Sequence, residues 1–364
     1  MAERVFLHVG APKTGTTYLQ HILWNNRETL KQAGFLLPGT RTAHYQAMGD
    51  LRRGLWHDPA GTWTWDRMAA TARDWPGTVI LSEEMLGAAT AEEAASAIER
   101  FAPAEVHVVV AGRDLWRTVP SSWQQAVRAR GLGRFGAYVT ALRSGVYPQF
   151  WQHQTPLPIL ERWGATLPPE RRHLVTVPAA GADPELLWAR FSEVVGIPAG
   201  LCRTDVEQGR GNTSLGAAET ELLRRVNVAL GDDYPLRAPY VNAVHRHLQN
   251  PVLMLRPRGE RFSVPAEHAD WLDAVAHQMV EELKAFPCHV VGDLDDLLPA
   301  DVSVLRSPDD VTDAELAQTA VETIVGMLRH AETLVAEAAP PPPRRRRGRM
   351  TRMLSLVMRA LTPS

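Results

Sequence analysis

Apolar residues occur in short runs along the first part of the chain, and the segments between these runs have helical spacing. Strands are predicted by four such runs, at residues 4–10, 78–83, 105–113 and 172–179. After the first run, residues 16–34 place Leu19, Ile22 and Leu30 on one side of a helix that ends at Gly34. Since the strands lack polar alternation and helices separate them, we expect a parallel sheet covered on both faces.

The second half of the chain has a mainly helical pattern from about residue 216 to 290, including a helix predicted at 265–285. A last helix is predicted after Thr312, because Glu315 completes a capping-box pattern three residues later. One stripe of this helix is apolar and is expected to pack on the core: Leu316, Ala320, Ile324 and Leu328.

Together these patterns predict a three-layer α/β domain with a central, mainly parallel sheet and extra helices in the C-terminal half. A single domain is expected over residues 1–335, with the sheet core at about 4–200 and the mainly helical part at about 216–335. Ligands of such sheets bind beyond the carboxyl ends of the strands. Three polar segments are expected at that edge: residues 10–17, 82–85 and 112–121.

Composition changes abruptly in the segment 336–364, where four consecutive prolines and four consecutive arginines precede a stretch of Met, Leu and Val. Two interpretations of this segment stay open. In one, residues 344–361 form an amphipathic helix in peripheral contact with an anionic membrane. In the other, the segment is a disordered, solvated tail.

Charge and cysteine content narrow the functional classes. The net charge of -2 argues against a protein whose surface binds nucleic acid broadly, because such proteins carry a basic excess. Cys202 and Cys288 stand far apart in the sequence, which indicates neither a disulfide framework nor a cysteine-rich zinc site. No run reaches the roughly 18–20 apolar residues of a membrane span, and the first motif leaves no room for a signal peptide. We therefore expect a cytoplasmic protein, peripheral at the inner membrane face if the tail binds lipid.

The segment GAPKTGTT, at residues 10–17, has the composition of a loop that holds an anion. Its glycines let backbone N–H groups turn inward, and a helix that begins near Thr16 points its positive end at the same place. Lys13 adds charge, and it is one of only three lysines, with Lys31 and Lys284. The lysine precedes the second glycine, so the pattern differs from the GxxxxGK[ST] loop of nucleoside triphosphatases. The alternative is a tight strand-to-helix turn capped by Thr16.

A second anion site is predicted where the strand at 105–113 ends. Arg113 lies at the end of this strand, and Ser121 follows eight residues later in the next turn and helix. A guanidinium with a serine hydroxyl suits a monophosphate, because it offers bidentate charge-assisted hydrogen bonds and one further donor. The alternative for Arg113 is an exposed salt bridge.

The loop and the Arg113–Ser121 pair resemble, in order and spacing, the motifs of sulfotransferases that use 3′-phosphoadenosine 5′-phosphosulfate. The resemblance covers about residues 4–300 and is to the bacterial and Golgi-type branch. It implies a sheet topology like that of P-loop kinases and this donor as co-substrate. The donor-binding residues it implies are Pro12, Lys13, Thr14, Gly15, Thr16, Thr17, Arg113 and Ser121. The GxxGxWK segment, which the cytosolic branch uses around the 3′-phosphate, is absent. Two interpretations of RGNTSL at 210–215 stay open: it takes this role through Arg210, Asn212 and Ser214, or it is a loop that caps the next helix.

Sulfuryl transfer requires a base for the acceptor hydroxyl and a positive charge at the departing oxygen. Lys13 suits the second task, and by the resemblance Glu83 is the first candidate for the base, with Glu84 in reserve. Adjacent carboxylates repel each other, which raises one pKa toward the value that a base needs. Their alternative role is to interact favourably with the start of a helix. His44 is a competing base or a substrate contact, and its alternative is a histidine buried with its hydrogen bonds satisfied.

The acceptor side is predicted to use His44, Trp123, Gln124 and Arg128, although packing along an apolar helix face also explains the last three. The expected function is transfer of a sulfuryl group to a hydroxyl of a carbohydrate, lipid or small metabolite, with no metal. Two alternatives are a small-molecule or nucleotide kinase and a catalytically inactive nucleotide-binding relative. The sequence predicts neither the acceptor nor the oligomeric state.

Overall fold

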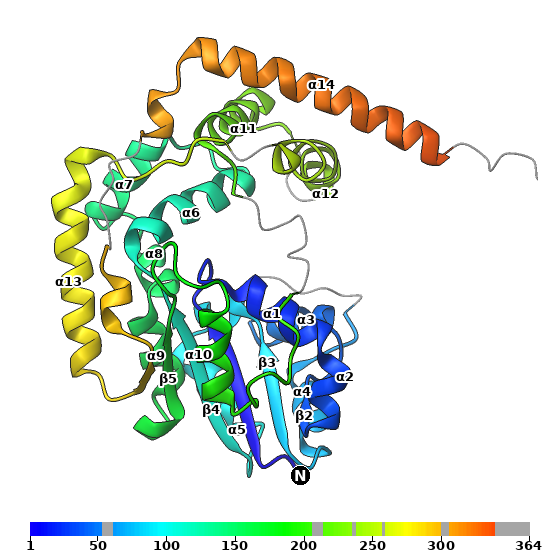
Figure 1. Cartoon of the computed structure of the whole chain (residues 1–364), viewed down its shortest axis with the longest axis vertical. Helices are drawn as coiled ribbons and strands as arrows, with labels where there is room; N and C mark the ends of the chain where they lie inside the picture. The colour runs from blue at the N-terminus through cyan, green and yellow to red at the C-terminus, as the bar shows by residue number, and fades with distance from the viewer. Residues whose placement is uncertain (53–60, 206–213, 235–237, 257–258, 300–305, 339–364) are drawn as a thin grey trace, which may run out of the picture.

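The structure is a computed structural model that describes residues 1–52, 61–205, 214–234, 238–256, 259–299 and 306–338 (Figure 1). Six strands form one parallel sheet in the order β2-β3-β1-β4-β5-β6. Their bounds are β1 Arg4–Gly10, β2 Phe35–Leu36, β3 Thr78–Ser82, β4 Glu105–Gly112, β5 Arg172–Thr176 and β6 His289–Val291. The four predicted strands are confirmed, and the two edge strands that the sequence analysis missed are only 2 and 3 residues long.

Side chains alternate between two hydrophobic clusters on the two faces of the sheet. On β1, Val5, Leu7 and Val9 contribute to one cluster, whereas Phe6 contributes to the other. The first cluster includes helices α3 Arg41–Leu51, α4 Trp65–Arg73, α5 Ala91–Glu99 and α9 Pro156–Gly164. The second includes α1 Thr16–Asn25, α2 Arg27–Gln32 and α10 Leu186–Val195. The prediction of an α/β fold with helices on both faces of a parallel sheet is therefore confirmed.

Strand β1 lies at the point where the chain changes direction across the sheet. It pairs with β3 on one side and with β4 on the other, so the connection through α5 carries the chain from one side of β1 to the other. In open parallel sheets, ligands bind at the carboxyl ends of strands that flank such a point. The loop after β1 and the ends of β3 and β4 meet there.

The remaining helices form the mainly helical half of the molecule (Figure 1). They are α6 Leu115–Arg128, α7 Phe135–Arg143, α8 Pro148–Gln154, α11 Ala217–Leu230, α12 Ala238–Tyr240, the π-helix η4 Val241–Gln249, α13 Ala269–Ala285 and α14 Asp313–Ala338. The cluster that begins on β1 continues into this half through Leu223 of α11 and Leu272 of α13. The helices within the described ranges include none that is long and apolar enough to cross a membrane.

Helix α14 begins as predicted, but only the first half of the predicted stripe, Leu316 and Ala320, is half-buried. The Thr312 amide donates to Glu315 Oε2 at 2.8 Å, which confirms the capping pattern. The expected packing stripe is wrong, because Ile324 is 57% exposed and Leu328 is 62% exposed. The face that packs carries small and polar residues instead: Thr319, Thr323 and Gly326.

The orientation of α14 predicts a difference between two identical substitutions. We expect Ile324→Ala to change the free energy of unfolding by no more than about 0.5 kcal/mol, because its side chain already contacts water. Ile22→Ala, at a fully buried position of α1, should cost about 2–5 kcal/mol. Urea unfolding followed by tryptophan fluorescence measures both, and similar losses at the two positions would contradict the observed orientation of the helix.

Candidate functional site

The loop after β1 forms a tight turn at the start of α1. Two of its residues have left-handed backbone conformations, with φ 67° at Lys13 and φ 84° at Gly15. A Cβ atom on Gly15 would lie 2.5 Å from Leu187 Cδ2, so only glycine fits there without a shift of Leu187. The Thr14 hydroxyl braces the turn by donating to the Ala11 carbonyl at 2.5 Å. The hydroxyls of Thr16 and Thr17, at the first turn of α1, have no hydrogen-bond partner within the described residues.

Lys13 lies within a group of basic side chains. Its pKa is lowered to about 8, chiefly by burial and also by the charges of Arg128 and Arg113, while Glu84 opposes the shift. Arg113 Nη1 also donates to the Lys13 carbonyl oxygen at 2.8 Å, which joins the end of β4 to the loop after β1. Cations gathered in this way favour an anion at the loop.

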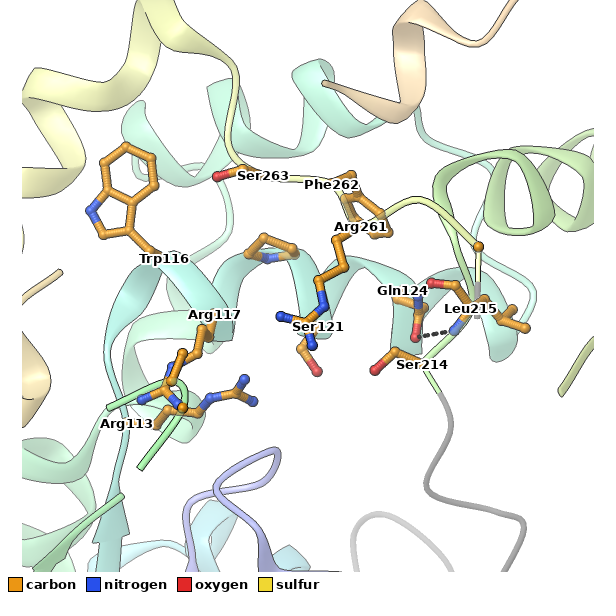
Figure 2. Close-up of a pocket in the computed structure, with 14 residues that line it drawn as sticks. Arg113, Trp116, Arg117, Ser121, Gln124, Ser214, Leu215, Arg261, Phe262 and Ser263 are labelled. Carbon is orange, nitrogen blue, oxygen red and sulfur yellow. Dashed lines mark hydrogen bonds between the residues drawn. The ribbon is translucent and has the colours of Figure 1, made fainter. Parts of the chain in front are cut away.

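A cavity of about 460 Å³ opens where β4 ends (Figure 2), and residues 10–17 are not among its lining residues. Its walls come from the start of α6 and from two segments of the helical half, near 214–215 and 259–263. The lining residues are Arg113, Trp116, Arg117, Pro120, Ser121, Gln124, Ala180, Gly181, Ser214, Leu215, Gly259, Arg261, Phe262 and Ser263. The structure therefore brings Arg113 and Ser121 to one cavity, as their predicted pairing requires.

Two buried donors of residues in this wall have no hydrogen-bond partner among the described residues: Arg113 Nε and Trp116 Nε1. Burial, reinforced by the nearby Arg117, lowers the pKa of Arg113 to about 10, whereas Asp114 acts in the opposite direction. Asp114 does not satisfy Arg113, since its carboxylate caps α6 and pairs with Arg117. Buried donors without partners are costly, so a ligand with acceptor atoms would be favoured in this cavity.

The sequence analysis missed several cavity residues, chiefly Trp116, Arg117, Arg261 and Phe262. Arg261 extends toward Ser121 in Figure 2, and within the described residues it has no hydrogen bond or ion pair. The signal in the sequence was RGERFS at 258–263, a glycine with arginines on either side in a non-helical stretch. Of the predicted alternative segment, Ser214 lines the cavity, whereas Arg210 and Asn212 lie outside the described residues.

The two candidate carboxylates lie where β3 ends. Burial raises the pKa of Glu83 to about 7, and repulsion from Glu84 acts in the same direction, whereas the Met85 amide and Arg41 oppose the shift. Glu83 also caps a short helix, η1 Glu84–Ala88, by accepting from the Met85 amide at 3.3 Å. Glu84 Oε2 accepts from Gln20 at 2.8 Å. Glu83 thus combines the predicted capping role with a pKa suited to a general base.

His44 is buried, and both of its ring nitrogens contact main-chain atoms. The Ser82 amide lies 3.3 Å from Nδ1, and Nε2 lies 2.9 Å from the Pro38 carbonyl oxygen. Burial lowers the pKa of this imidazole to about 4, while the contacts with Ser82 and Pro38 raise it. This arrangement supports the alternative of a satisfied histidine that holds the end of β3, and leaves no free ring nitrogen for a base.

The other predicted acceptor contacts have separate places in the fold. Trp123 is buried against Phe135 and Phe262 and donates to the Gly133 carbonyl, so it packs in the core. The Gln124 amide donates to the Leu215 carbonyl at 2.8 Å and thereby holds one wall of the cavity. Arg128 contacts Gln249 and Met254, and its charge reaches Lys13.

Comparisons with known proteins add no further constraint. No protein-family profile matches the chain, and neither curated proteins nor solved structures give a significant match. Across the described ranges, no three His, Cys, Asp or Glu side chains are grouped so that they could hold a metal ion. The function must therefore be argued from the geometry and charges of the site.

The charges around Lys13 predict its titration. We expect the Lys13 ammonium to titrate near pH 8, and Arg113→Ala to raise that midpoint, because it removes a neighbouring positive charge. Nuclear magnetic resonance of protein labelled at lysine Cε measures this directly, since only three lysines need assignment. Arg203→Ala, at an exposed arginine paired with Asp205, serves as the control and should leave the midpoint unchanged. A wild-type midpoint near 10.5 would contradict the burial of Lys13.

Proposed function

We propose that this protein is a sulfotransferase that uses 3′-phosphoadenosine 5′-phosphosulfate. The observation that carries the proposal is the pairing of two anion sites, the loop around Lys13 and the cavity of Arg113 and Ser121, joined by the 2.8 Å hydrogen bond from Arg113 to the Lys13 carbonyl. A donor with a 5′-phosphosulfate and a separate 3′-phosphate presents two anionic groups. The strand order β2-β3-β1-β4-β5 supports the kinase-like topology that the motif resemblance implies.

The residues present fit this donor. The loop, with Lys13 and the free hydroxyls of Thr16 and Thr17, suits the 5′-phosphosulfate. Arg113 Nε and the Ser121 hydroxyl would donate to the 3′-phosphate. Trp116 and Phe262 offer aromatic surface against which the adenine ring could stack. When bound, the donor supplies a sulfuryl group on an oxygen that also bridges to phosphorus.

The chemistry is a direct in-line displacement. The acceptor oxygen forms a bond to sulfur as the bond from sulfur to the bridging oxygen breaks, and that oxygen departs with the electron pair on the nucleotide. Glu83 takes the proton of the acceptor hydroxyl, and protonated Lys13 stabilises the charge that develops on the bridging oxygen. The acceptor is a hydroxyl of a carbohydrate, lipid or small metabolite. A cytoplasmic location and membrane contact through residues 344–361 stay predictions, since that segment lies outside the described residues.

Two other functions are weighed against this proposal. A small-molecule or nucleotide kinase is disfavoured because Lys13 precedes Gly15 and because β3 ends at Ser82, followed by Glu83, rather than in an aspartate for magnesium. An inactive nucleotide-binding relative would keep the donor site and have no use for a carboxylate of raised pKa. The variants below separate these functions.

Nucleotide binding tests the donor site. We expect 3′-phosphoadenosine 5′-phosphate to raise the melting temperature of the wild type more than ATP with magnesium does. Arg113→Ala should weaken binding of this nucleotide about 10- to 100-fold, because a charged hydrogen-bond donor is lost. Binding of adenosine 5′-phosphate should change less. Equal affinity of the wild type for the two adenosine nucleotides would contradict the assignment of Arg113 and Ser121.

Substitution of the base separates catalysis from binding. Glu83→Gln should lower kcat at least about 100-fold while the affinity for the donor product stays within about twofold, because general base catalysis contributes on this scale. Lys13→Ala should lower kcat about 100- to 1,000-fold through loss of charge stabilisation. Single-turnover rates over a panel of acceptors measure both effects. A wild type that is inactive over a broad panel yet binds the nucleotide would favour the inactive relative.

The pH profile follows from the same two groups. The base must be deprotonated, so kcat/KM should rise with pH through about 7, where Glu83 titrates. Lys13 must be protonated, so kcat/KM should fall above about 8. Glu83→Gln should remove the rising limb and keep the falling one; an unchanged rising limb would exclude Glu83 as the base.

A further inference from the structure

Two segments of the helical half cross directly above the cavity. Gly216 precedes α11, and a Cβ atom at this position would lie 2.7 Å from Gly259 Cα. Next to this point, the Ala217 amide donates to the Glu260 carbonyl at 2.9 Å. The two main chains therefore touch, and each of them leads into a wall of the cavity.

A buried carboxylate fills the space beside this crossing. Glu219, in the first turn of α11, is 6% exposed, and its Oε2 would lie 2.5 Å from a Cβ atom on either Gly216 or Gly259. That oxygen is buried, and within the described part of the chain it has no hydrogen-bond partner. Glycine at both positions is what lets the carboxylate and the two backbones come so close.

Arg256 links this carboxylate to α14. Its Nε lies 3.4 Å from Glu219 Oε1, its Nη1 donates to the Thr319 carbonyl at 3.2 Å, and its guanidinium also pairs with Glu322. One ionic chain thus runs from α14 through Arg256 to the crossing above the cavity. Arg256 thus meets α14 at the Thr319 main-chain carbonyl and at the Glu322 side chain.

We infer that Glu219 is a positioning residue of the cavity, whose buried carboxylate, paired with Arg256, fixes the crossing of Gly216 and Gly259 and thereby places Arg261 opposite Ser121. Arg261 follows Gly259 by two residues and has no anchor of its own within the described residues. Figure 2 shows it reaching toward Ser121 from the segment that this crossing holds. The position of the arginine therefore depends on the crossing.

The chain offers a matched control for Glu219. Glu221 lies two residues further along the same helix and is also buried, but it pairs with Arg224 and Arg225 away from the cavity. Glu219→Gln and Glu221→Gln each remove one buried negative charge that is paired with arginine. Effects that come only from lost helix stability should appear in both variants.

Hydrogen exchange without ligand tests the crossing itself. In Glu219→Gln we expect exchange of amides at 259–263 and of Ala217 to become about tenfold faster, because local opening costs less free energy. Glu221→Gln should leave these amides within about twofold of the wild type. Unchanged exchange at 259–263 in Glu219→Gln would overturn the inference, whatever any ligand does.

Nucleotide binding tests the consequence for Arg261, and this part rests on the proposed function. Glu219→Gln should weaken binding of 3′-phosphoadenosine 5′-phosphate about tenfold and that of adenosine 5′-phosphate less than about twofold. If Glu219→Gln weakened the binding of both nucleotides equally, or weakened neither, the role of Glu219 in placing Arg261 would be overturned. A wild type with no preference for the 3′-phosphorylated nucleotide would refute the proposed donor instead, and the exchange result would still decide the role of Glu219.

A second variant keeps the test valid if Glu219→Gln folds poorly. Gly259→Ala leaves every charge in place but puts a methyl group 2.5 Å from Glu219 Oε2 and 3.1 Å from Gly216 Cα. It should produce the same faster exchange and the same selective loss of the 3′-phosphorylated nucleotide. Gly133→Ala, at a glycine where an added Cβ atom has nothing within 4 Å, is the control. Wild-type behaviour of Gly259→Ala would overturn the inference.

Discussion

The hydrogen bond from Arg113 to the Lys13 carbonyl joins the two parts on which the site depends. One part is the turn after the central strand, and the other is the end of the neighbouring strand and the start of α6. Because β1 and β4 are parallel neighbours, both segments leave the sheet at the same edge. Arg113 Nη1 is therefore bonded to the loop, while its buried Nε has no partner among the described residues.

Positive charge predominates at this edge of the sheet. The charges of Arg113 and Arg128 act on Lys13 and are opposed by Glu84, while Asp114 pairs with Arg117. Burial depresses the pKa of Lys13 and of Arg113, which is the physical sign of charge that lacks compensation. An anionic ligand would offset this cost, and the same burial gives Glu83 the pKa of a base.

The helical half contributes more than coverage of the sheet. It carries Arg261 and Phe262 to the cavity, and its polar contacts join α14, α11 and the segment at 259–263. Interfaces of this kind are usually apolar, so the polar packed face of α14 and its exposed Ile324 and Leu328 reverse the ordinary pattern. Arg256 meets that helix at the Thr319 main-chain carbonyl and at the Glu322 side chain.

Local chemistry alone determined much of this protein. The four longer strands, the start of α1 and the cap of α14 follow from periodicity and from glycine and threonine at fixed offsets. The composition of the loop at residues 10–17 and the spacing of Arg113 and Ser121 are equally local, so the sequence could indicate two anion sites.

Tertiary structure decided the rest. The strands β2 and β6 are too short to show periodicity and exist where β3 and β5 offer edges for pairing. Arg261 and Ser121 line one cavity although they are far apart in the sequence, and two glycines let the distant backbones beside it cross. Helix α14 leaves Ile324 and Leu328 exposed, and Arg256 binds the helix at the Thr319 carbonyl. Periodicity and turn chemistry are encoded in short windows of sequence, whereas these contacts depend on the free energy of packing segments that lie far apart in the chain.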